Sequence, residues 1–451
     1  MTTRICAATL SLVATALAAC SGGGDGPLGE GAEALGGQAI VGKVLFDDAL
    51  PDTNGRSCAT CHVEDEHTTL VPASVTARLH QDPHDPLFNA IDADDPTAAS
   101  LQFAHLQAGL VRVNVAMADN LDLVDENGVV VTGPERTVAL WRAVPTVENT
   151  AYTAPYQLDG RVATLHEQAT QALLNHSQMS VAPPALAVSA IAAFERTVFS
   201  GPAAAAVAEA LAEGEDPPDG QPPLHPGSDA AAGKVLYDQA CRPCHGGATG
   251  IHLLDEAAHD MLFPELNADG SVTLTQPDPD GTQYPAHVLH NHHGDRYLNL
   301  GIAGGTYLGQ VGAFPNFTGV DFPRYRVRFY TDGSRTKKLF DLPPLPPAIG
   351  PNLTAQAFSV DPGRALISGD PADFEAFDTP QLRGIKDTAP YFHDNSGPDL
   401  PTVLDIYSRF ILPQLPSLHL PRALPPEGPG LPPESLSPTQ KSQLLAYLNL
   451  I

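Results

Sequence analysis

One five-residue pattern occurs twice in this chain of 451 residues, as Cys58-Ala59-Thr60-Cys61-His62 and as Cys241-Arg242-Pro243-Cys244-His245. Two thiols at this spacing can each add across a vinyl group of haem, and the histidine that follows then lies beside the iron as an axial ligand. A zinc site or a redox-active cysteine pair also uses this spacing, but neither needs a histidine after the second cysteine in both copies. The pattern therefore predicts two haem c groups, attached through Cys58, Cys61, Cys241 and Cys244, with His62 and His245 as iron ligands.

The first twenty residues have the composition of an export signal. Arg4 precedes an apolar run from Ile5 to Ala19, which is too short to span a bilayer as a mature helix. Residues 17–20 (Leu-Ala-Ala-Cys) resemble a bacterial lipobox, which implies cleavage before Cys20 and lipidation of that residue; a plain signal peptide is the alternative. We predict a signal peptide over residues 1–19, a lipidated Cys20 with a flexible tether over 20–38, and a location on the periplasmic side as an outer-membrane lipoprotein. Covalent haem attachment outside the cytoplasm agrees with export.

The charge balance limits the kinds of partner. Lys and Arg total 24 against 52 Asp and Glu, a net charge of −28, which argues against nucleic acid or an anionic membrane surface. A small basic electron-transfer protein would be attracted to such a surface, although the charge also serves to keep a secreted protein soluble. The 44 Pro and 39 Gly predict long, irregular loops.

The sequence around the two cysteine motifs is also repeated. Gly42–Asp47 and Gly233–Asp238 precede the motifs, and Pro145–Asp159 matches Pro380–Asp394 at an offset of 235 positions. Leu165 and Leu400 keep this offset, whereas the cysteine motifs themselves are 183 positions apart. Two copies of one fold are therefore expected, with about 52 additional residues in the second copy, within 246–377.

These features predict two haem domains with long Pro/Gly-rich loops. The N-terminal haem domain is placed at 39–212, an extended linker at 213–229 and the C-terminal haem domain at 230–451. Helices are expected over 185–196, near 203–212, and after a capping box at 437–440, the last packing on the second domain. In the helices that open each domain, we expect Val44, Leu45, Val235 and Leu236 to face the porphyrin.

In order and combination, the motifs resemble the di-haem cytochrome c peroxidase and MauG superfamily. The resemblance rests on the two CxxCH motifs, on 144–149 leading to 159–161 and 165–169, and on 377–383 leading to 388–394. It implies a mainly α-helical protein with two cytochrome-c-like haem domains and with the haems near the domain interface. It also implies a first haem that meets peroxide and a second that passes electrons. It also implies a calcium ion held by carbonyls that match Thr388 and Pro390. The family usually has an inter-haem Trp where this chain has Leu158; Trp141 lies upstream, and Tyr152 is a substitute.

The resemblance also points to the sixth ligand of the second haem. In the family's peroxidases a Met lies fourteen residues after the histidine that matches His393, and here that position holds Tyr407. Tyrosine is the MauG-like variant, and a phenolate ligand favours ferric and higher oxidation states. In the alternative, Tyr407 is a buried helical tyrosine, and the ligand is Met261 or one of His287, His290, His292 and His293.

The same offset places Ala172 at the corresponding position of the first copy, so the first iron is expected to be open on that side. Glu167 stands where the second copy has Thr402, and Gln157 where it has Phe392. A carboxylate there would transfer a proton during cleavage of a bound peroxide, so Glu167 is the predicted catalytic residue; an exposed helical glutamate is the alternative. Gln157 is the predicted polar partner of the bound oxygen species. His67 and His80 are candidates for a histidine that blocks the first iron.

We therefore expect a peroxidase-like oxidoreductase that reduces hydrogen peroxide at the first haem, using electrons from a cytochrome c or cupredoxin relayed through the second. MauG-like oxidation of a protein or organic substrate is one alternative. A non-catalytic di-haem electron carrier is another, and a dioxygenase like more distant di-haem proteins is a third.

Overall fold

The computed structural model describes residues 32–215, 218, 222–245, 318–343, 357–412 and 434–451, with short pieces at 265–266, 272–273, 297–298, 303, 306 and 310. The predicted signal peptide, Cys20, Met261 and the histidines at 287, 290, 292 and 293 lie outside these residues. Among the helices that are described, none has both the length and the apolar composition of a membrane span.

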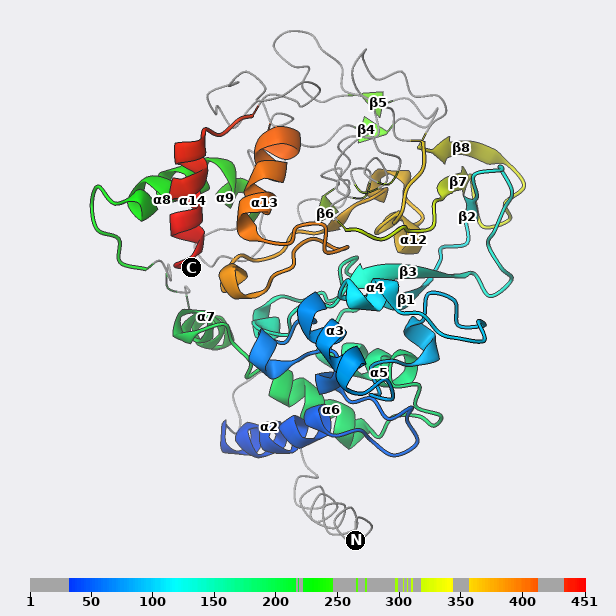
Figure 1. Ribbon diagram of the computed structural model, residues 1–451, viewed down its shortest axis with the longest axis horizontal. Helices are drawn as coiled ribbons and strands as arrows, with labels where there is room; N and C mark the ends of the chain where they lie inside the picture. The colour runs from blue at the N-terminus through cyan, green and yellow to red at the C-terminus, as the bar shows by residue number, and fades with distance from the viewer. Residues whose placement is uncertain are drawn as a thin grey trace, which may run out of the picture.

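Each copy of the repeat is framed by a pair of packed helices. In the first copy α2 (Ala32–Asp47) packs on α6 (Ala185–Glu195), and in the second α8 (Asp229–Ala240) packs on α14 (Pro438–Leu448). Figure 1 shows the first pair at the lower end of the molecule and the second at the upper left. The prediction that the C-terminal helix packs on the second domain is confirmed.

Both helix pairs meet at a glycine. A Cβ atom at Gly42 would lie 1.9 Å from the carbonyl oxygen of Ala190, and one at Gly233 would lie 1.9 Å from that of Gln443. Any larger side chain would therefore force the helices apart. The two contacts align the copies in space, so that each position of α6 corresponds to the position of α14 that is 253 residues later.

The segments offset by 235 residues form the same local structure. Tyr156 donates a hydrogen bond of 2.9 Å to the Thr150 carbonyl, and Tyr391 donates one of 2.7 Å to the Ile385 carbonyl. A helix follows in each copy, α5 (Leu165–Asn175) or α13 (Leu400–Ile406). The two helices are capped in the same way, because the side chains of Thr164 and Asp399 accept hydrogen bonds from the backbone N–H three residues later.

Strands connect the two halves, a feature that the mainly α prediction did not include. β1 (Leu110–Ala116) pairs with β3 (Thr137–Ala143), both within the first half. β2 (Leu121–Val124) pairs instead with β7 (Arg326–Tyr330), which pairs with β8 (Lys338–Leu342). Buried residues of these strands share one apolar core with the second half. The predicted domains are therefore joined by a common sheet and core.

The remaining elements are short. Those of the first half are η1 (Cys58–Thr60), η2 (Glu64–Glu66), α3 (Pro72–Gln81), η3 (Ala90–Asp92), α4 (Ala104–Gln107), η4 (Thr150–Tyr152) and α7 (Pro202–Glu213). Those of the second half are α9 (Arg242–His245), β4 (Glu265–Leu266), β5 (Val272–Thr273), β6 (Tyr297–Leu298), α12 (Ala365–Ser368), η5 (Pro371–Asp373), β9 (Phe377–Asp378), η6 (Ile385–Asp387) and the π-helix η7 (Tyr407–Ile411).

Several helix predictions are confirmed, and one is partly wrong. α6, α7 and the capping box of Ser437 and Gln440 lie where the sequence placed them, and the described residues between α7 and α8 form no helix or strand. Leu45 and Leu236 are buried, but Val44 is 37% exposed and Val235 is 55% exposed. Consecutive helical residues point about 100° apart, so only one of each pair can face the interior.

Candidate functional site

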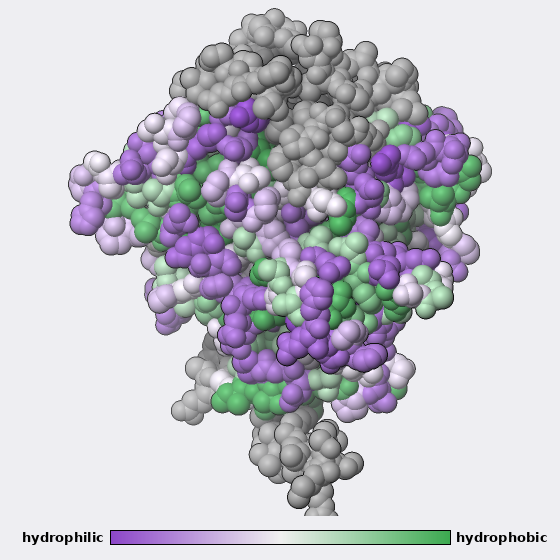
Figure 2. All heavy atoms as spheres, in the orientation of Figure 1, coloured by the Kyte–Doolittle hydropathy of each residue, from purple (hydrophilic) through white to green (hydrophobic). Residues whose placement is uncertain are grey.

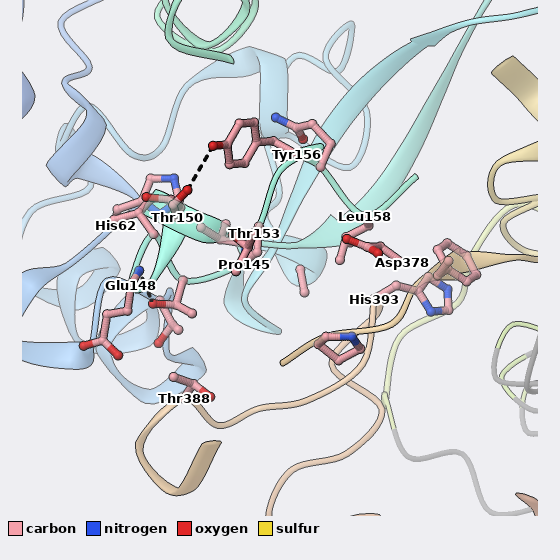
Figure 3. A pocket seen from close by; sticks show the side chains of 18 of the residues that line it. His62, Pro145, Glu148, Thr150, Thr153, Tyr156, Leu158, Asp378, Thr388 and His393 are labelled. Atoms are coloured by element: carbon pink, nitrogen blue, oxygen red, sulfur yellow. Dashed lines mark hydrogen bonds between the residues drawn. The ribbon is translucent and has the colours of Figure 1, made fainter. Parts of the chain in front are cut away.

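Both cysteine motifs open onto one cavity of about 470 Å³ between the two halves. Its lining includes Cys58, Cys61 and His62 from the first motif, and Cys241 and His245 from the second. Figure 3 shows part of it, with His62 on one side and Leu158, Asp378 and His393 on the other. A cavity of this size with a few polar groups has the dimensions of a site for a cofactor or small ligand.

His62 is oriented by a turn of backbone. Its Nδ1 atom lies 2.9 Å from the Thr68 carbonyl oxygen, so Nδ1 carries the proton and Nε2 keeps a free lone pair. Thr68 is held in turn, because its hydroxyl lies 2.8 Å from that of Thr146 and accepts from the Val147 N–H at 3.0 Å. Burial lowers the pKa of His62 to about 4, so the ring is neutral and able to bind a metal at ordinary pH.

His245 is oriented in the same way and faces Tyr407. Its Nδ1 lies 2.8 Å from the Pro380 carbonyl oxygen, and its Nε2 lies 3.2 Å from the Tyr407 hydroxyl. Burial raises the pKa of Tyr407, so without a metal the phenol is protonated and donates to Nε2. Tyr407 is also the first residue of the π-helix η7, a local geometry that is frequent at functional sites.

The four motif cysteines fit covalent haem attachment. All four are free thiols, and burial raises the pKa of Cys61 to about 11 and that of Cys241 and Cys244 to about 12. Each pair is accompanied by a histidine whose Nε2 is available, so the residues present match the donors that a haem c requires. Bound in this way, each haem would be held by its thioethers, with His62 or His245 as an axial ligand.

The helices over the two halves of the cavity are lined differently. α5 contributes Gln168, Gln171, Asn175 and, at its end, His176, whereas α13 contributes Leu400, Val403 and Leu404 before Tyr407. The Oε1 atom of Gln168 is buried and has no hydrogen-bond partner among the described residues. α5 also contributes Leu165 and Ala172, so the helix over the first half is of mixed polarity, whereas α13 is apolar up to Tyr407.

His176 was not predicted from the sequence. It lies one helical turn after Ala172, the residue that corresponds to Tyr407, and it lines the cavity. Burial lowers its pKa, and its charge would oppose that of His62. The signal was its spacing of four residues from Ala172, which places both on one helix face.

The structure separates the two predicted catalytic side chains. Gln157 lines the cavity, and its Oε1 accepts a hydrogen bond of 3.1 Å from Arg161. Glu167 is exposed, and its Oε2 accepts a hydrogen bond of 3.2 Å from the Ala163 N–H. It is not among the described residues that line the cavity, although its neighbour Gln168 is. The catalytic role of Glu167 stays a prediction.

Of the described residues, neither His67 nor His80 lines the cavity. His80 is exposed at the end of α3, and the Nδ1 of His67 lies 3.1 Å from Glu148. Glu148 does line the cavity, and burial raises its pKa. The pair places His67 beside the site but directed toward a carboxylate.

A buried ionic network joins the two halves beside the cavity. Arg142 on β3 donates to Asp159 at 2.6 Å and to Asp361 at 2.6 and 3.0 Å, and Arg161 donates to Asp159 at 2.7 Å. Arg142 is 2% exposed. Burial raises the pKa of Asp159, but the charges of Arg142 and Arg161 hold it below its usual range. These charges fix the segment 157–161 against the second half.

Comparisons with known proteins find a family similarity in the first copy. Residues 37–212 match the family of di-haem cytochrome c peroxidases. Cytochrome-c peroxidase IdrP2 of Denitromonas iodatirespirans is 35% identical over 91 residues, which are 20% of this chain and 21% of that protein. The match thus spans about a fifth of that relative. The match agrees, over the first copy, with the family resemblance predicted from the sequence.

Solved structures also align with most of the chain. A MauG-like protein associated with microbial copper homeostasis covers 92% of this chain and 87% of its own, at 18% identity and a TM-score of 0.40. The diheme peroxidase BthA from Burkholderia thailandensis covers 92% and 85%, at 14% identity and a TM-score of 0.36.

The position between the two haem sites holds no tryptophan in this chain. Trp141 is not among the described residues that line the cavity; its ring stacks on that of His105 at 4.3 Å, with the Arg112 guanidinium 4.9 Å from its centroid. A nearby cation disfavours removal of an electron from the indole. Tyr152 does not line the cavity either. Leu158 does, and its carbonyl accepts a hydrogen bond of 2.8 Å from the Asp378 N–H, which joins the two halves (Figure 3).

The residues predicted to hold calcium, Thr388 and Pro390, both line the cavity in the turn after η6. Within the described part of the chain, no group of three His, Cys, Asp or Glu side chains is arranged for a metal ion. The predicted site uses backbone carbonyls, so that finding leaves it a prediction.

Proposed function

We propose that this chain is an exported di-haem c-type oxidoreductase that reduces hydrogen peroxide at the haem of Cys58, Cys61 and His62, with electrons relayed through the haem of Cys241, Cys244 and His245. The observation that carries the proposal is the cavity shared by both motifs, with Gln168 from α5 on the side of His62 and Tyr407 beside His245. Covalent haem would supply the redox-active iron at each position.

Side chains of the chain itself would bind and orient peroxide in the first half. Gln168 presents an unpartnered buried oxygen there, and Gln157 is fixed by Arg161 at the same cavity. Proton transfer between the two peroxide oxygens is assigned to Glu167. To reach the cavity, its side chain must leave the Ala163 N–H, which costs one exposed hydrogen bond of about 1 kcal/mol.

Steady-state kinetics with purified holoprotein, hydrogen peroxide and reduced cytochrome c or cupredoxin tests the proposal. We expect turnover that falls 100-fold or more in Glu167→Gln, within the range attributed to a positioned acid–base group. Glu209→Gln, at an exposed position on α7, is the matched control and should keep full activity. Absence of a high-spin ferric signal in electron paramagnetic resonance, together with absence of turnover, would instead favour a non-catalytic electron carrier.

Tyr407 favours a second candidate, the MauG-like oxidation of a protein or organic substrate by peroxide. A phenolate opposite His245 would stabilise ferric and higher oxidation states over ferrous iron. With this ligand, the second haem would have a lower reduction potential than a Met-ligated haem. Oxidation of an added phenol by peroxide, without consumption of reduced cytochrome c, would support this candidate over the peroxidase.

The proposed partners follow from the surface and the export signal. The acidic chain suits a basic cytochrome c or cupredoxin, and hydrophilic residues cover much of the described surface on the face in Figure 2. Lipidation at Cys20 would tether the protein to the membrane on the periplasmic side. Metabolic labelling with a fatty-acid analogue, lost in Cys20→Ser, tests the anchor.

A further inference from the structure

Glu195 is a buried acid that the proposed mechanism does not use. It is the last residue of α6, is 2% exposed, and lines the first half of the cavity near Cys58. Its backbone carbonyl accepts a hydrogen bond of 2.9 Å from the Thr150 hydroxyl. Its side-chain atom Oε2 is buried and has no hydrogen-bond partner among the described residues.

The second copy has no acid at this place. The glycine contacts align Ala190 with Gln443 and Phe194 with Tyr447, so Glu195 corresponds to Leu448. Leu448 is 5% exposed and lines the second half of the same cavity. Since an apolar residue fills this position in the second copy, the packing of the helices does not by itself require a carboxyl group in the first.

The surroundings of Glu195 offer its charge little compensation. Burial raises its pKa to about 8, opposed by the positive charge of Arg196, the residue that follows it. The helices packed on α6 carry Lys43 and Asp47 on α2, which pair with each other at 2.6 Å, and His166 and Glu167 on α5. Beside η1, Cys58 faces it and is uncharged, both as a thiol, whose pKa burial raises, and as a thioether to haem. No described hydrogen bond or ion pair joins any of these groups to the Glu195 carboxyl.

We propose that Glu195 is a redox-linked proton site of the first half of the cavity. This inference rests on the proposed function, since it requires a redox group at His62. When a one-electron oxidant removes an electron there, the cavity gains one positive charge, and the Glu195 carboxyl releases its proton to solvent as its O–H bond breaks. When a one-electron donor returns the electron, the carboxylate takes up a proton from solvent. Each cycle therefore leaves the charge of this half unchanged.

The physical reason is the cost of an uncompensated charge away from water. A unit charge interacts several times more strongly in the protein interior than in bulk solvent. A neutral acid that ionises as the positive charge appears cancels most of that cost. Leu448 gives the second copy no carboxyl group at the corresponding position.

Proton release on oxidation of the reduced holoprotein by ferricyanide, followed with a pH-indicator dye in weak buffer between pH 6 and 8, tests the inference. We expect wild type to release up to one proton per first-site electron, and Glu195→Gln and Glu195→Leu to lose most of that release. Glu209→Gln should match wild type. Haem propionates titrate in every variant, so the difference between variants isolates Glu195.

Infrared difference spectroscopy gives a second readout. The carbonyl band of a protonated carboxylic acid should disappear on oxidation of wild type and be absent from Glu195→Gln. Equal proton release from wild type and Glu195→Gln, or a carboxylic acid band that the substitution leaves in place, would overturn the inference. Neither measurement uses peroxide turnover, and a protein without haem at His62, recognised from its absorption spectrum, would refute the proposed function instead.

Discussion

Replacing Glu195 by Gln should make the stability of the protein less sensitive to rising pH. The carboxyl is 2% exposed, and one of its oxygens has no hydrogen-bond partner among the described residues. The folded state therefore holds the acid in its protonated form, whereas the unfolded chain ionises it at the ordinary pKa of 4.5. Glutamine has nearly the same shape but does not titrate.

The size and sign of the effect follow from the pKa of Glu195. Its folded pKa of about 8 lies above the unfolded value of 4.5, so the stabilisation is fully present below pH 4.5 and is lost as the pH rises toward 8. Each pKa unit corresponds to about 1.4 kcal/mol, so the whole loss is about 5 kcal/mol, of which roughly 3 kcal/mol falls between pH 5 and pH 7. The buried amide of the variant carries a cost of its own, but that cost does not depend on pH.

The assay is urea unfolding of wild type, Glu195→Gln and Glu209→Gln holoprotein at several pH values between 5 and 8, followed by circular dichroism. The free energy of unfolding of Glu195→Gln minus that of wild type should rise by roughly 3 kcal/mol from pH 5 to pH 7. The exposed control should show no such rise. Parallel pH dependences of wild type and Glu195→Gln would refute the burial argument.

Three further substitutions test the fold and the second haem site. Gly233→Ala should cost about 3 kcal/mol or more in stability, as overpacking of a core does, because its Cβ would lie 1.9 Å from the Gln443 carbonyl oxygen. Gly36→Ala in α2 is the control: a Cβ there has nothing within 4 Å, so the change should be neutral or stabilising. Equal melting temperatures of the two variants would argue against the α8–α14 contact. Arg142→Met leaves Asp159 and Asp361 buried without their shared cation and should lower the free energy of chemical unfolding by about 3–5 kcal/mol. Arg335→Met removes a partly exposed 3.8 Å pair with Asp122 and should cost less than about 1 kcal/mol. Similar losses in the two variants would contradict the role given to burial. Tyr407→Phe should remove phenolate-to-iron absorption and raise the reduction potential of the second haem, and an unchanged spectrum would exclude Tyr407 as a ligand.

The features that sequence reasoning predicted correctly are local or repeated. Both CxxCH motifs contribute residues to one cavity, and the capping box of Ser437 and Gln440 marks the start of a helix; both patterns depend on residues a few positions apart. The offset of 235 identified the paired turns at Tyr156 and Tyr391 because one chain segment folds the same way twice.

The features it missed depend on contacts that are distant in sequence. Val111, Val113 and Val115 alternate with polar residues as a strand should, and β1 could have been predicted from that pattern. The pairing of Leu123 in β2 with Val327 in β7 could not, because no local signal specifies a partner about 200 residues away. Glu195 was missed for a related reason, since its burial results from the packing of α2 and α5 around α6.

The two copies share a backbone frame and differ in the side chains that face the cavity. The helix pairs, the tyrosine turns and the histidine orientation are the same in both, so the frame does not distinguish the two haem sites. The side chains that face the cavity do: Gln168 corresponds to Val403, Ala172 to Tyr407, and Glu195 to Leu448. Two of these differences give the first copy an amide or a carboxyl where the second copy has an aliphatic side chain, and the third gives the second copy a phenol where the first has an alanine. An amide and a carboxyl suit a site where protons and a polar substrate enter, and a phenol beside His245 suits a site that exchanges electrons alone.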